Sequence, residues 1–472
     1  MQLLSLLFLV LYTLAIAGVM LVIITDNRSP LKSLAWIVVL LLAPVVGLFG
    51  YFFFGQDLSK RRLISRRMRR RIQTRLGQQA ATDGARVPAQ WQPLSALLRN
   101  TIEALPLDGS RITLYTDGRT KMESLREAIA GARHHIHLQY YIFDDDRTGC
   151  ALRELLVRKA QEGVAVRILY DDVGCARVKR AFFEEMRRNG IEVRAFLPVQ
   201  FPRFTSKVNY RNHRKLAVID GCIGFLGGMN IADRYVDGPA WGGCWRDNHF
   251  RIEGGGVAAL QASFLNDWSA TTKQAVADAA CYPPLPRFAD GATLQLVASG
   301  PFGKWRALLQ GESYAIANAR RRIWIQTPYY LPSELLDATL QEAALAGRDV
   351  RLMLPERSDS TLVHLASHSF LDDMFRAGVK VSFYAPGFLH AKLLIVDDDL
   401  TVIGSANMDF RSFEHNFEAN AFVYDRAFTA RMAACFEEDE RACRAVTPGE
   451  WFRRPRRRRL LESCMRLFAP LM

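Results

Sequence analysis

The sequence predicts two similar α/β halves preceded by a two-helix transmembrane hairpin. Two observations carry this prediction: a pair of long apolar stretches at the N-terminus, and a set of strand and helix patterns that occurs twice further along. A chain of 472 residues is too long for one ordinary hydrophobic core, so two or three domains are expected. Its hydrophobic content of 49% supplies enough apolar side chains to fill them.

The two apolar stretches, 3–24 and 34–54, are each long enough to cross a bilayer, which takes about 20 helical residues. A short polar break at 25–33 separates them, so residues 1–56 predict a hairpin of two spans. The alternative for the first stretch is a cleaved signal peptide. The stretch has no basic region before it and stays apolar to its end, which favours a retained helix.

A strongly basic segment follows the hairpin. It has nine Lys and Arg residues between positions 60 and 75 and no acidic one, whereas the loop between the spans has only Arg28 and Lys32. Positive charge stays on the cytoplasmic side, so the long C-terminal part is expected in the cytoplasm. Apolar residues recur in this segment every four positions, which predicts a helix lying in the membrane interface; a solvated charged linker is the alternative. These residues are Ile64, Met68, Ile72 and Leu76, and the basic ones are Lys60, Arg61, Arg62, Arg66, Arg67, Arg69, Arg70, Arg71 and Arg75.

The rest of the chain repeats one pattern of elements. Each copy has a strand, a helix that ends at a glycine, and two more strands, and this order implies parallel α/β units. The first copy has strands at 136–142, 164–169 and 190–193 with a helix at 152–162, and the second has strands at 323–330, 350–354 and 378–381 with a helix at 335–346. The expected divisions are 57–110 for the basic segment and linker, 111–285 and 286–452 for the two halves, and 453–472 for a C-terminal tail.

Each half carries the pattern H-x-K-x4-D-x6-G-[GS]-x-N at identical spacing. An apolar strand separates the histidine from the aspartate, and histidine and lysine, two residues apart, point to the same side. A pseudo-twofold packing of the halves would bring two histidines, two lysines and two asparagines into one cleft. The first copy is His213, Lys215, Asp220 and Asn230; the second is His390, Lys392, Asp397 and Asn407, with Ser405 where the first copy has Gly228.

These residue types suit phosphodiester chemistry. A neutral imidazole can attack phosphorus and form a phosphoenzyme, and a second, protonated one can protonate the leaving alkoxide. Lysines and asparagine amides can hold the phosphoryl oxygens, so neither a metal nor another cofactor is expected. Each histidine also needs an orienting carboxylate. The candidates are Glu418, 28 residues after His390, and Asp247 in the first half, where the loop is six residues longer.

The doubled pattern resembles the twin motif of the phospholipase D superfamily, and further strings resemble its bacterial cardiolipin synthase branch. The strings are those at 212–215, 227–231, 245–247, 299–301 and 407–412. The resemblance implies two phospholipase D-like α/β/α halves that convert two phosphatidylglycerols into cardiolipin and glycerol through a phosphohistidine. It also implies His213 as nucleophile, His390 as acid, phosphate binding by Asn230, Asn407 and Ser405, and a place in the bacterial cytoplasmic membrane among anionic lipids.

Other functions share the motif. A phospholipase using water, a transferase using another headgroup, a nuclease and an inactive membrane scaffold are the alternatives. The net charge of +14 would suit a nuclease, but the basic residues lie beside the predicted bilayer, so no nucleic-acid partner is expected. Both motif copies are intact, which disfavours the scaffold.

Several further signals are weaker. His134, His135 and His137 could bind a metal, but the sequence shows no matching Cys/His set around them. Two acidic triplets, at 144–146 and 397–399, fall where turns are expected. The tail combines an arginine run at 453–459 with apolar residues after it, which predicts a second interfacial anchor; a disordered terminus is the alternative.

Overall fold

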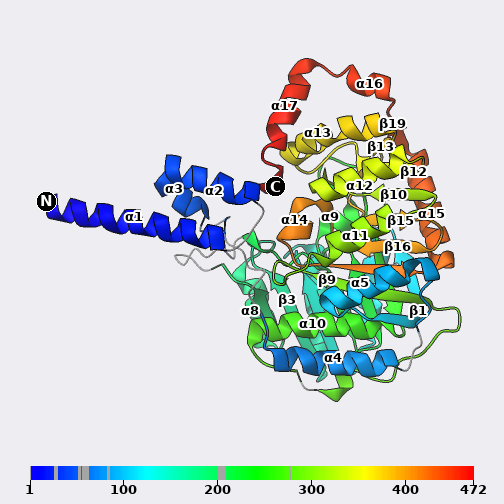
Figure 1. The fold of residues 1–472 in the computed structure, drawn as a ribbon. Coiled ribbons are helices and arrows are strands. Elements are labelled where there is room, and N and C mark those ends of the chain that lie inside the picture. The colour runs from blue at the N-terminus through cyan, green and yellow to red at the C-terminus, as the bar shows by residue number, and fades with distance from the viewer. Residues whose placement is uncertain are drawn as a thin grey trace.

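The N-terminal helices project from the body of the molecule (Figure 1). The computed structural model describes residues 2–25, 30–51, 55, 63–81, 85–199, 209–276 and 278–471. Helix α1 spans Gln2–Thr25, and α2 (Pro30–Leu42) and α3 (Pro44–Gly50) fold back beside it. The polar residues at 26–29 and the basic residues Lys60, Arg61 and Arg62, on which part of the orientation prediction rests, lie outside the described residues.

The second apolar stretch forms two helices and not the single span that the sequence predicts. Pro44 has no N–H and its ring clashes with the preceding turn, so α2 ends and Ala43 takes a non-helical ψ of 67°. Helix α3 then packs so closely on α2 that a Cβ at Gly47 would lie 3.0 Å from Leu40 Cα. The 13 residues of α2 are about 20 Å long, less than the roughly 30 Å hydrocarbon core. Within the described ranges, no helix combines the length and hydropathy of a membrane span, so the predicted hairpin of two spans is not confirmed.

The basic segment is a helix whose apolar side is buried by protein. Helix α4 (Arg66–Ala81) packs on α10 (Gly256–Thr272). Its residues Ile72 and Leu76 are only 8% and 5% exposed because they join the hydrophobic core beneath α10. The apolar stripe therefore packs inside the protein and stabilises the fold, whereas the sequence predicted that it would lie in a membrane interface. Arginines of the same helix, such as Arg71, remain exposed.

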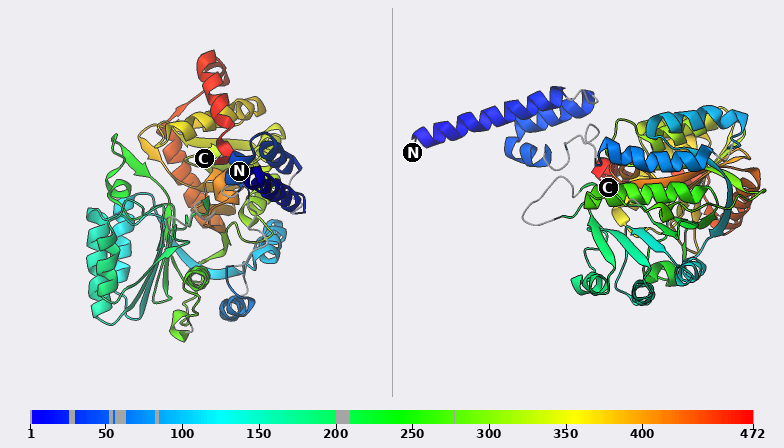
Figure 2. Two further views of the ribbon diagram at one scale, coloured as in Figure 1. Left: turned by 90° about the vertical axis from the view of Figure 1, so that its left-hand side faces the viewer. Right: turned by 90° about the horizontal axis from the view of Figure 1, so that it is seen from below.

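A 15-stranded sheet forms the centre of the described chain. It is visible edge-on in Figure 2. The first half contributes β1 (Pro106–Tyr115), β2 (His135–Tyr140), β3 (Ala165–Asp171), β4 (Glu192–Phe196), β5 (Leu216–Ile219), β6 (Ile223–Gly227) and β8 (His249–Glu253). The second contributes β9 (Ala292–Ser299), β10 (Arg322–Gln326), β12 (Asp349–Pro355), β13 (Lys380–Tyr384), β15 (Leu393–Val396), β16 (Leu400–Gly404), β18 (Glu418–Tyr424) and β19 (Cys443–Ala445).

The strand order displays the repeat. Outward from the central β1–β9 pair, the first half runs β1-β8-β6-β5-β2-β3-β4 and the second runs β9-β18-β16-β15-β10-β12-β13. Each of the seven strands of the first half has a counterpart at the same position in the second, which adds only the edge strand β19. This correspondence confirms the predicted pair of α/β halves. Strands β2, β3 and β4 of the first half are parallel, and so are β10, β12 and β13 of the second, as their strand–helix–strand order predicts. The strands nearer the centre pair antiparallel, and β19 pairs antiparallel with β13 at the outer edge of the second half.

Helices cover both faces of this sheet and make three layers. One face carries α10 and α15, whose apolar side chains form a core shared by the two halves. The other face carries separate cores for the first and the second half. The helices of that face are α6 (Gly118–Ala130), α7 (Arg147–Gln161) and α8 (Arg180–Arg188) in the first half, and α5 (Gln92–Ile102), α11 (Ala307–Ala317), α12 (Glu334–Leu345) and α13 (Thr361–Ala377) in the second; α15 is Arg426–Arg441.

Candidate active site

The first histidine of the repeated motif is positioned by main-chain pairing with the second half. Asn212 forms a parallel bridge with Phe417, and the His213 N–H donates to the Phe417 carbonyl at 2.9 Å. The residue after Phe417 is Glu418, which is fully buried. Its Oε1 lies 2.9 Å from His213 Nδ1. The backbone contact thus sets a carboxylate of the second half on the imidazole of the first.

The second histidine is positioned by the equivalent contact, with the roles of the two halves exchanged. Strand β14 (Gly387–Leu389) pairs in parallel with β7 (Cys244–Arg246), and the His390 N–H donates to the Arg246 carbonyl at 2.7 Å. The residue after Arg246 is Asp247, whose Oδ2 lies 2.6 Å from His390 Nδ1. Asp247 is also fully buried.

The carboxylates are therefore exchanged between the halves. Each half contributes one carboxylate, as the sequence predicts, but the structure places each on the histidine of the opposite half. Neither half holds a complete histidine–carboxylate pair by itself. Because a carboxylate on Nδ1 fixes the tautomer and leaves Nε2 free, both imidazoles are prepared to react at Nε2.

The difference between Ser405 and Gly228 follows from the carboxylate that each accompanies. The Ser405 hydroxyl donates to Glu418 Oε2 at 2.5 Å and accepts from the Ala419 N–H at 3.0 Å. In the first half the shorter Asp247 occupies this space itself, because a Cβ at Gly228 would lie 2.1 Å from Asp247 Oδ1. The Ser405 hydroxyl, which was expected to bind phosphate, is thus hydrogen-bonded to the Glu418 carboxylate.

The motif lysines are buried beside their own histidines. Lys215 is fully buried and its Nζ donates to the His213 carbonyl at 2.5 Å, and Lys392, 3% exposed, donates to the His390 carbonyl. Burial lowers the pKa of Lys215 well below its usual value and that of Lys392 to about 8. Lys392 therefore remains mainly an ammonium at pH 7.

Both imidazoles are neutral at pH 7 when the cleft holds no ligand. Burial, opposed by the Glu418 carboxylate, lowers the pKa of His213. Burial and the neighbouring Lys392 ammonium lower the pKa of His390 to about 4. A phosphodiester anion in the cleft adds negative charge, which raises the pKa of an imidazole and makes protonation of one of them easier.

The two orienting carboxylates are ionised. Burial by itself would raise their pKa values, but the imidazole and lysine next to each carboxylate outweigh burial. The net pKa of Glu418 is lowered, with the Ser405 hydrogen bond contributing, and that of Asp247 is lowered by Lys392 and His390. The cluster thus holds two buried carboxylates against the two imidazoles and the two lysines.

The motif asparagines line the same region but already have partners. Asn230 Oδ1 accepts from the Ile142 N–H at 3.0 Å, and its Nδ2 donates to the Tyr235 hydroxyl at 2.6 Å. Asn407 Nδ2 donates to Asp409 at 2.9 Å, while its buried Oδ1 has no hydrogen-bond partner among the described residues. Each amide NH2 has a second N–H, with which it could hold a phosphate oxygen.

The structure does not bring Asp220 and Asp397 to this cluster. They lie at the far ends of β5 and β15, a whole strand away from the histidines. Asp220 accepts three backbone N–H groups of residues 133–135 at 2.8–2.9 Å, and Asp397 accepts those of residues 320–322 at 2.7–3.3 Å. Both have a positive φ, 52° and 53°. They therefore fix the loops that enter β2 and β10 and do not contact the reacting groups.

Aromatic rings that the sequence analysis left without a role enclose the histidines. The Tyr141 ring lies 4.9 Å from that of His213, and the rings of Trp245 and Phe388 lie 5.1 and 5.5 Å from that of His390. Tyr141 directly follows β2. Its position at the end of a strand was the only feature of the sequence that could have placed it in the site. These rings supply apolar walls that limit the access of water.

The other polar signals lie elsewhere in the fold. His135 and His137 join Cys281, with ligand atoms within 4.8 Å of one another, but both imidazoles contact the Gln261 side chain, at 3.2 and 2.9 Å. They lie at the end of β2 opposite to the histidine cluster. Within the acidic triplets, Asp146 caps α7, and Asp398 pairs with Arg321 and Arg322 while Asp399 accepts from Trp91 Nε1. The acidic triplets thus serve local structure, and Cys281 is a possible third ligand beside His135 and His137 that spacing along the chain did not indicate.

Two half-sites that complete each other across a pseudo-twofold axis define an enzyme of the phospholipase D type. The family model described as "Cardiolipin synthase, PLD-like domain" matches residues 125–268 and 314–440, one segment in each half. A second model, phospholipase D-nuclease N-terminal, matches residues 10–56. The chain belongs to the cardiolipin synthase family.

Relatives of similar length support this membership. The major cardiolipin synthase ClsA of Bacillus subtilis is 38% identical over 484 aligned positions, covering 100% of this chain and 99% of that protein. Cardiolipin synthase 2 of Bacillus anthracis is 39% identical, covering 96% of this chain and 89% of that protein. Among solved structures, the phosphatidylserine synthase of Haemophilus influenzae has a TM-score of 0.61 over 80% of this chain and 98% of that one; at 14% identity this likeness concerns the fold alone.

Proposed function

We propose that this protein transfers a phosphatidyl group from one phosphatidylglycerol to another, giving cardiolipin and glycerol. The exchange of carboxylates between the halves is the observation that carries the proposal, because it joins two histidines into one site. A site with two imidazoles suits a reaction in two steps, in which one group bonds to phosphorus and the other moves protons.

In the first step, His213 Nε2 attacks phosphorus of the first phosphatidylglycerol. The new N–P bond replaces the P–O bond to glycerol. The glycerol oxygen takes the Nε2 proton of His390, which is protonated when the anionic phosphodiester is bound. In the second step, a hydroxyl of the second phosphatidylglycerol gives its proton to His390 and attacks phosphorus, and the N–P bond breaks. Cardiolipin and glycerol are the products, and both histidines return to their starting state.

The remaining motif residues are proposed to hold the phosphoryl group. The ammonium group of Lys392 stabilises the negative charge that develops on the oxygens, Lys215 Nζ donates a hydrogen bond to them, and the amides of Asn230 and Asn407 orient them. Ser405 is proposed to act through Glu418 and is therefore a positioning residue. The aromatic rings beside the histidines favour a lipid alcohol over water in the second step.

We also propose that the enzyme works at the bacterial cytoplasmic membrane as an integral protein with its body in the cytoplasm. Helices α1, α2 and α3 expose large apolar side chains, among them Leu14, Leu42 and Val46 at 63%, 81% and 69%. So large an exposed apolar surface requires a lipid or protein environment. Retention of the protein in the membrane pellet after alkaline carbonate extraction is the expected result; release would make the attachment peripheral.

Product analysis tests the proposed reaction. The purified full-length enzyme is incubated with phosphatidylglycerol in detergent micelles, and lipids are identified by mass spectrometry. Cardiolipin with an equal amount of glycerol is expected, whereas phosphatidic acid as the main product would make the enzyme a hydrolase. His213→Ala and His390→Ala should each abolish turnover with an unchanged unfolding temperature, and full activity in either variant would contradict the two-histidine mechanism.

A further inference from the structure

The C-terminal residues form a helix that is fixed on the body of the molecule. Helix α17 (Arg456–Arg466) packs on α13. Its Glu462 is 1% exposed and accepts from Arg454 and Arg458, each at 3.0 Å. Asp372 of α13 accepts from Arg454 and Arg459 at 2.9 and 3.3 Å. These ion pairs are partly buried, with Arg458 and Arg459 about half exposed. They set the rotation of α17 about its axis, so the face that it turns outward is defined.

The outward face of α17 is apolar in its C-terminal part. Glu462 points inward, and residues two positions before, and two and five positions after it, lie on the opposite side of a helix. These are Leu460, Cys464 and Leu467, and all are exposed, the two leucines at 68% and 79%. Phe468 follows at 50% exposure. A helix that buries its acidic group and exposes its leucines is inverted relative to an ordinary surface helix.

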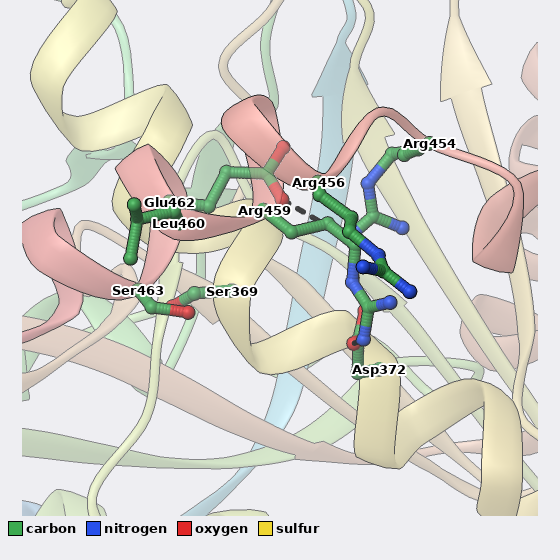
Figure 3. A pocket seen from close by; sticks show the side chains of 8 residues that line it. All are labelled: Ser369, Asp372, Arg454, Arg456, Arg459, Leu460, Glu462 and Ser463. Atoms are coloured by element: carbon green, nitrogen blue, oxygen red, sulfur yellow. Dashed lines mark hydrogen bonds and ion pairs between the residues drawn. The ribbon is translucent and has the colours of Figure 1, made fainter.

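The same outward face is basic in its N-terminal part. Arg456 and Arg457 are exposed there. Figure 3 shows arginine side chains near Asp372 at a pocket between α17 and α13. The pocket has a volume of about 340 Å³ and is lined by Ser369, Asp372, Arg454, Arg456, Arg459, Leu460, Glu462 and Ser463. Arg454 and Arg459 already donate to Asp372 there, so the exposed Arg456 and Arg457 are the arginines that we consider for contact with a phosphate group.

Helix α17 lies on the side of the molecule from which the N-terminal helices project (Figure 1). The turn after α17, η5 (Ala469–Leu471), packs against α14 (Phe410–Glu414). The ring of Phe410 in turn has Lys32 Nζ of α2 at 4.9 Å from its centre. The exposed leucines of α17 and the exposed apolar side chains of α1–α3 therefore belong to neighbouring parts of one surface.

We propose that the outward face of α17 lies in the interface of an anionic bilayer. Leu460, Leu467 and Phe468 enter the acyl region, while Arg456 and Arg457 contact lipid phosphates. The inference rests on the proposed function only in requiring that the enzyme works at a membrane. Its consequence is a second contact, remote in sequence from α1–α3, that fixes the orientation of the catalytic cleft relative to the lipid headgroups.

Two native cysteines allow a direct test on the full-length protein. Cys464 lies on the outward face of α17 and Cys244 lies on β7, and both are exposed. The protein is reconstituted in vesicles of phosphatidylcholine alone or with one third phosphatidylglycerol, and labelling by a membrane-impermeant maleimide is followed by peptide mass spectrometry. Labelling of Cys464 relative to Cys244 should slow at least about tenfold in the anionic vesicles and recover at high salt. An equal ratio in both vesicles would overturn the proposal.

Charge variants provide the second arm. In Arg456→Gln/Arg457→Gln, labelling of Cys464 in anionic vesicles should accelerate, by roughly fivefold for each arginine removed. The matched control is Arg426→Gln/Arg441→Gln, two exposed arginines of α15, which should change nothing. Equal effects of the two pairs would contradict a specific contact. Cardiolipin formation in micelles should be unaltered in both, so a failure of the proposed reaction remains separate from a failure of this contact.

Discussion

The charge on Glu418 should be essential although this residue is remote in sequence from His213. Its Oε1 lies 2.9 Å from His213 Nδ1, its Oε2 is held by Ser405, and the side chain is fully buried. Glu418→Gln keeps the shape but removes the charge. A hydrogen bond to a charged group contributes about 1.5–3 kcal/mol, which corresponds to a loss of roughly 10- to 150-fold in kcat. If the new amide turns its NH2 toward Nδ1, the wrong tautomer results and the loss is larger.

A neighbouring glutamate offers the matched control. Glu312 is also buried and accepts from Asn420 at 2.9 Å, and burial raises its pKa to about 8. It is therefore mainly protonated at pH 7, and Glu312→Gln replaces one neutral group by another. Initial rates of cardiolipin formation in micelles, at saturating phosphatidylglycerol, should fall at least tenfold in the Glu418 variant and stay within about twofold of wild type in the control. Equal rates in the two variants would refute the assigned role of the carboxylate.

Three further predictions concern the same site. Ser405→Ala removes one hydrogen bond to Glu418 and should lower kcat about tenfold, less than Glu418→Gln, in the same assay. Activity in micelles should survive excess chelator because lysines hold the phosphate; loss that Mg²⁺ or Zn²⁺ restores would contradict this. Because burial lowers the pKa of His390 to about 4, the folded state resists its protonation while the unfolded state accepts a proton near pH 6.5. Stability is therefore present above pH 6.5 and lost as the pH falls toward 4, by about 2 kcal/mol between pH 7 and 5. Thermal unfolding should show a shallower pH dependence in His390→Gln, and an unchanged slope would argue against a neutral buried imidazole.

The fold was predictable where local patterns carry it. Strand–helix–strand order gave the parallel units, and near-constant spacing between the copies gave the two halves. The two elements that were predicted wrongly are the basic helix and the second apolar stretch. The face with Ile72 and Leu76 has the periodicity of an interfacial helix, but periodicity does not say whether lipid or α10 covers it. The second apolar stretch reads as one span by hydropathy, although Pro44 breaks it.

The candidate site was predictable in its residue types and less so in its connections. The doubled motif identified the histidines and lysines that the structure gathers. It also included Asp220 and Asp397, which have the same spacing in both copies but cap loops at the far strand ends. The exchange of Glu418 and Asp247 between the halves depends on tertiary contacts such as the Asn212–Phe417 bridge. The spacing of residues along the chain does not reveal such contacts.

Trapping the covalent intermediate tests the central claim most directly. The full-length enzyme is mixed with phosphatidylglycerol carrying labelled phosphate, quenched within milliseconds under alkaline conditions that preserve phosphohistidine, and digested for peptide mass spectrometry. The composite site predicts label on the peptide containing His213, its absence in His213→Ala, and slower appearance in Glu418→Gln. Label on the peptide containing His390 would reverse the assigned roles, and no label on either histidine during active turnover would contradict the phosphohistidine mechanism.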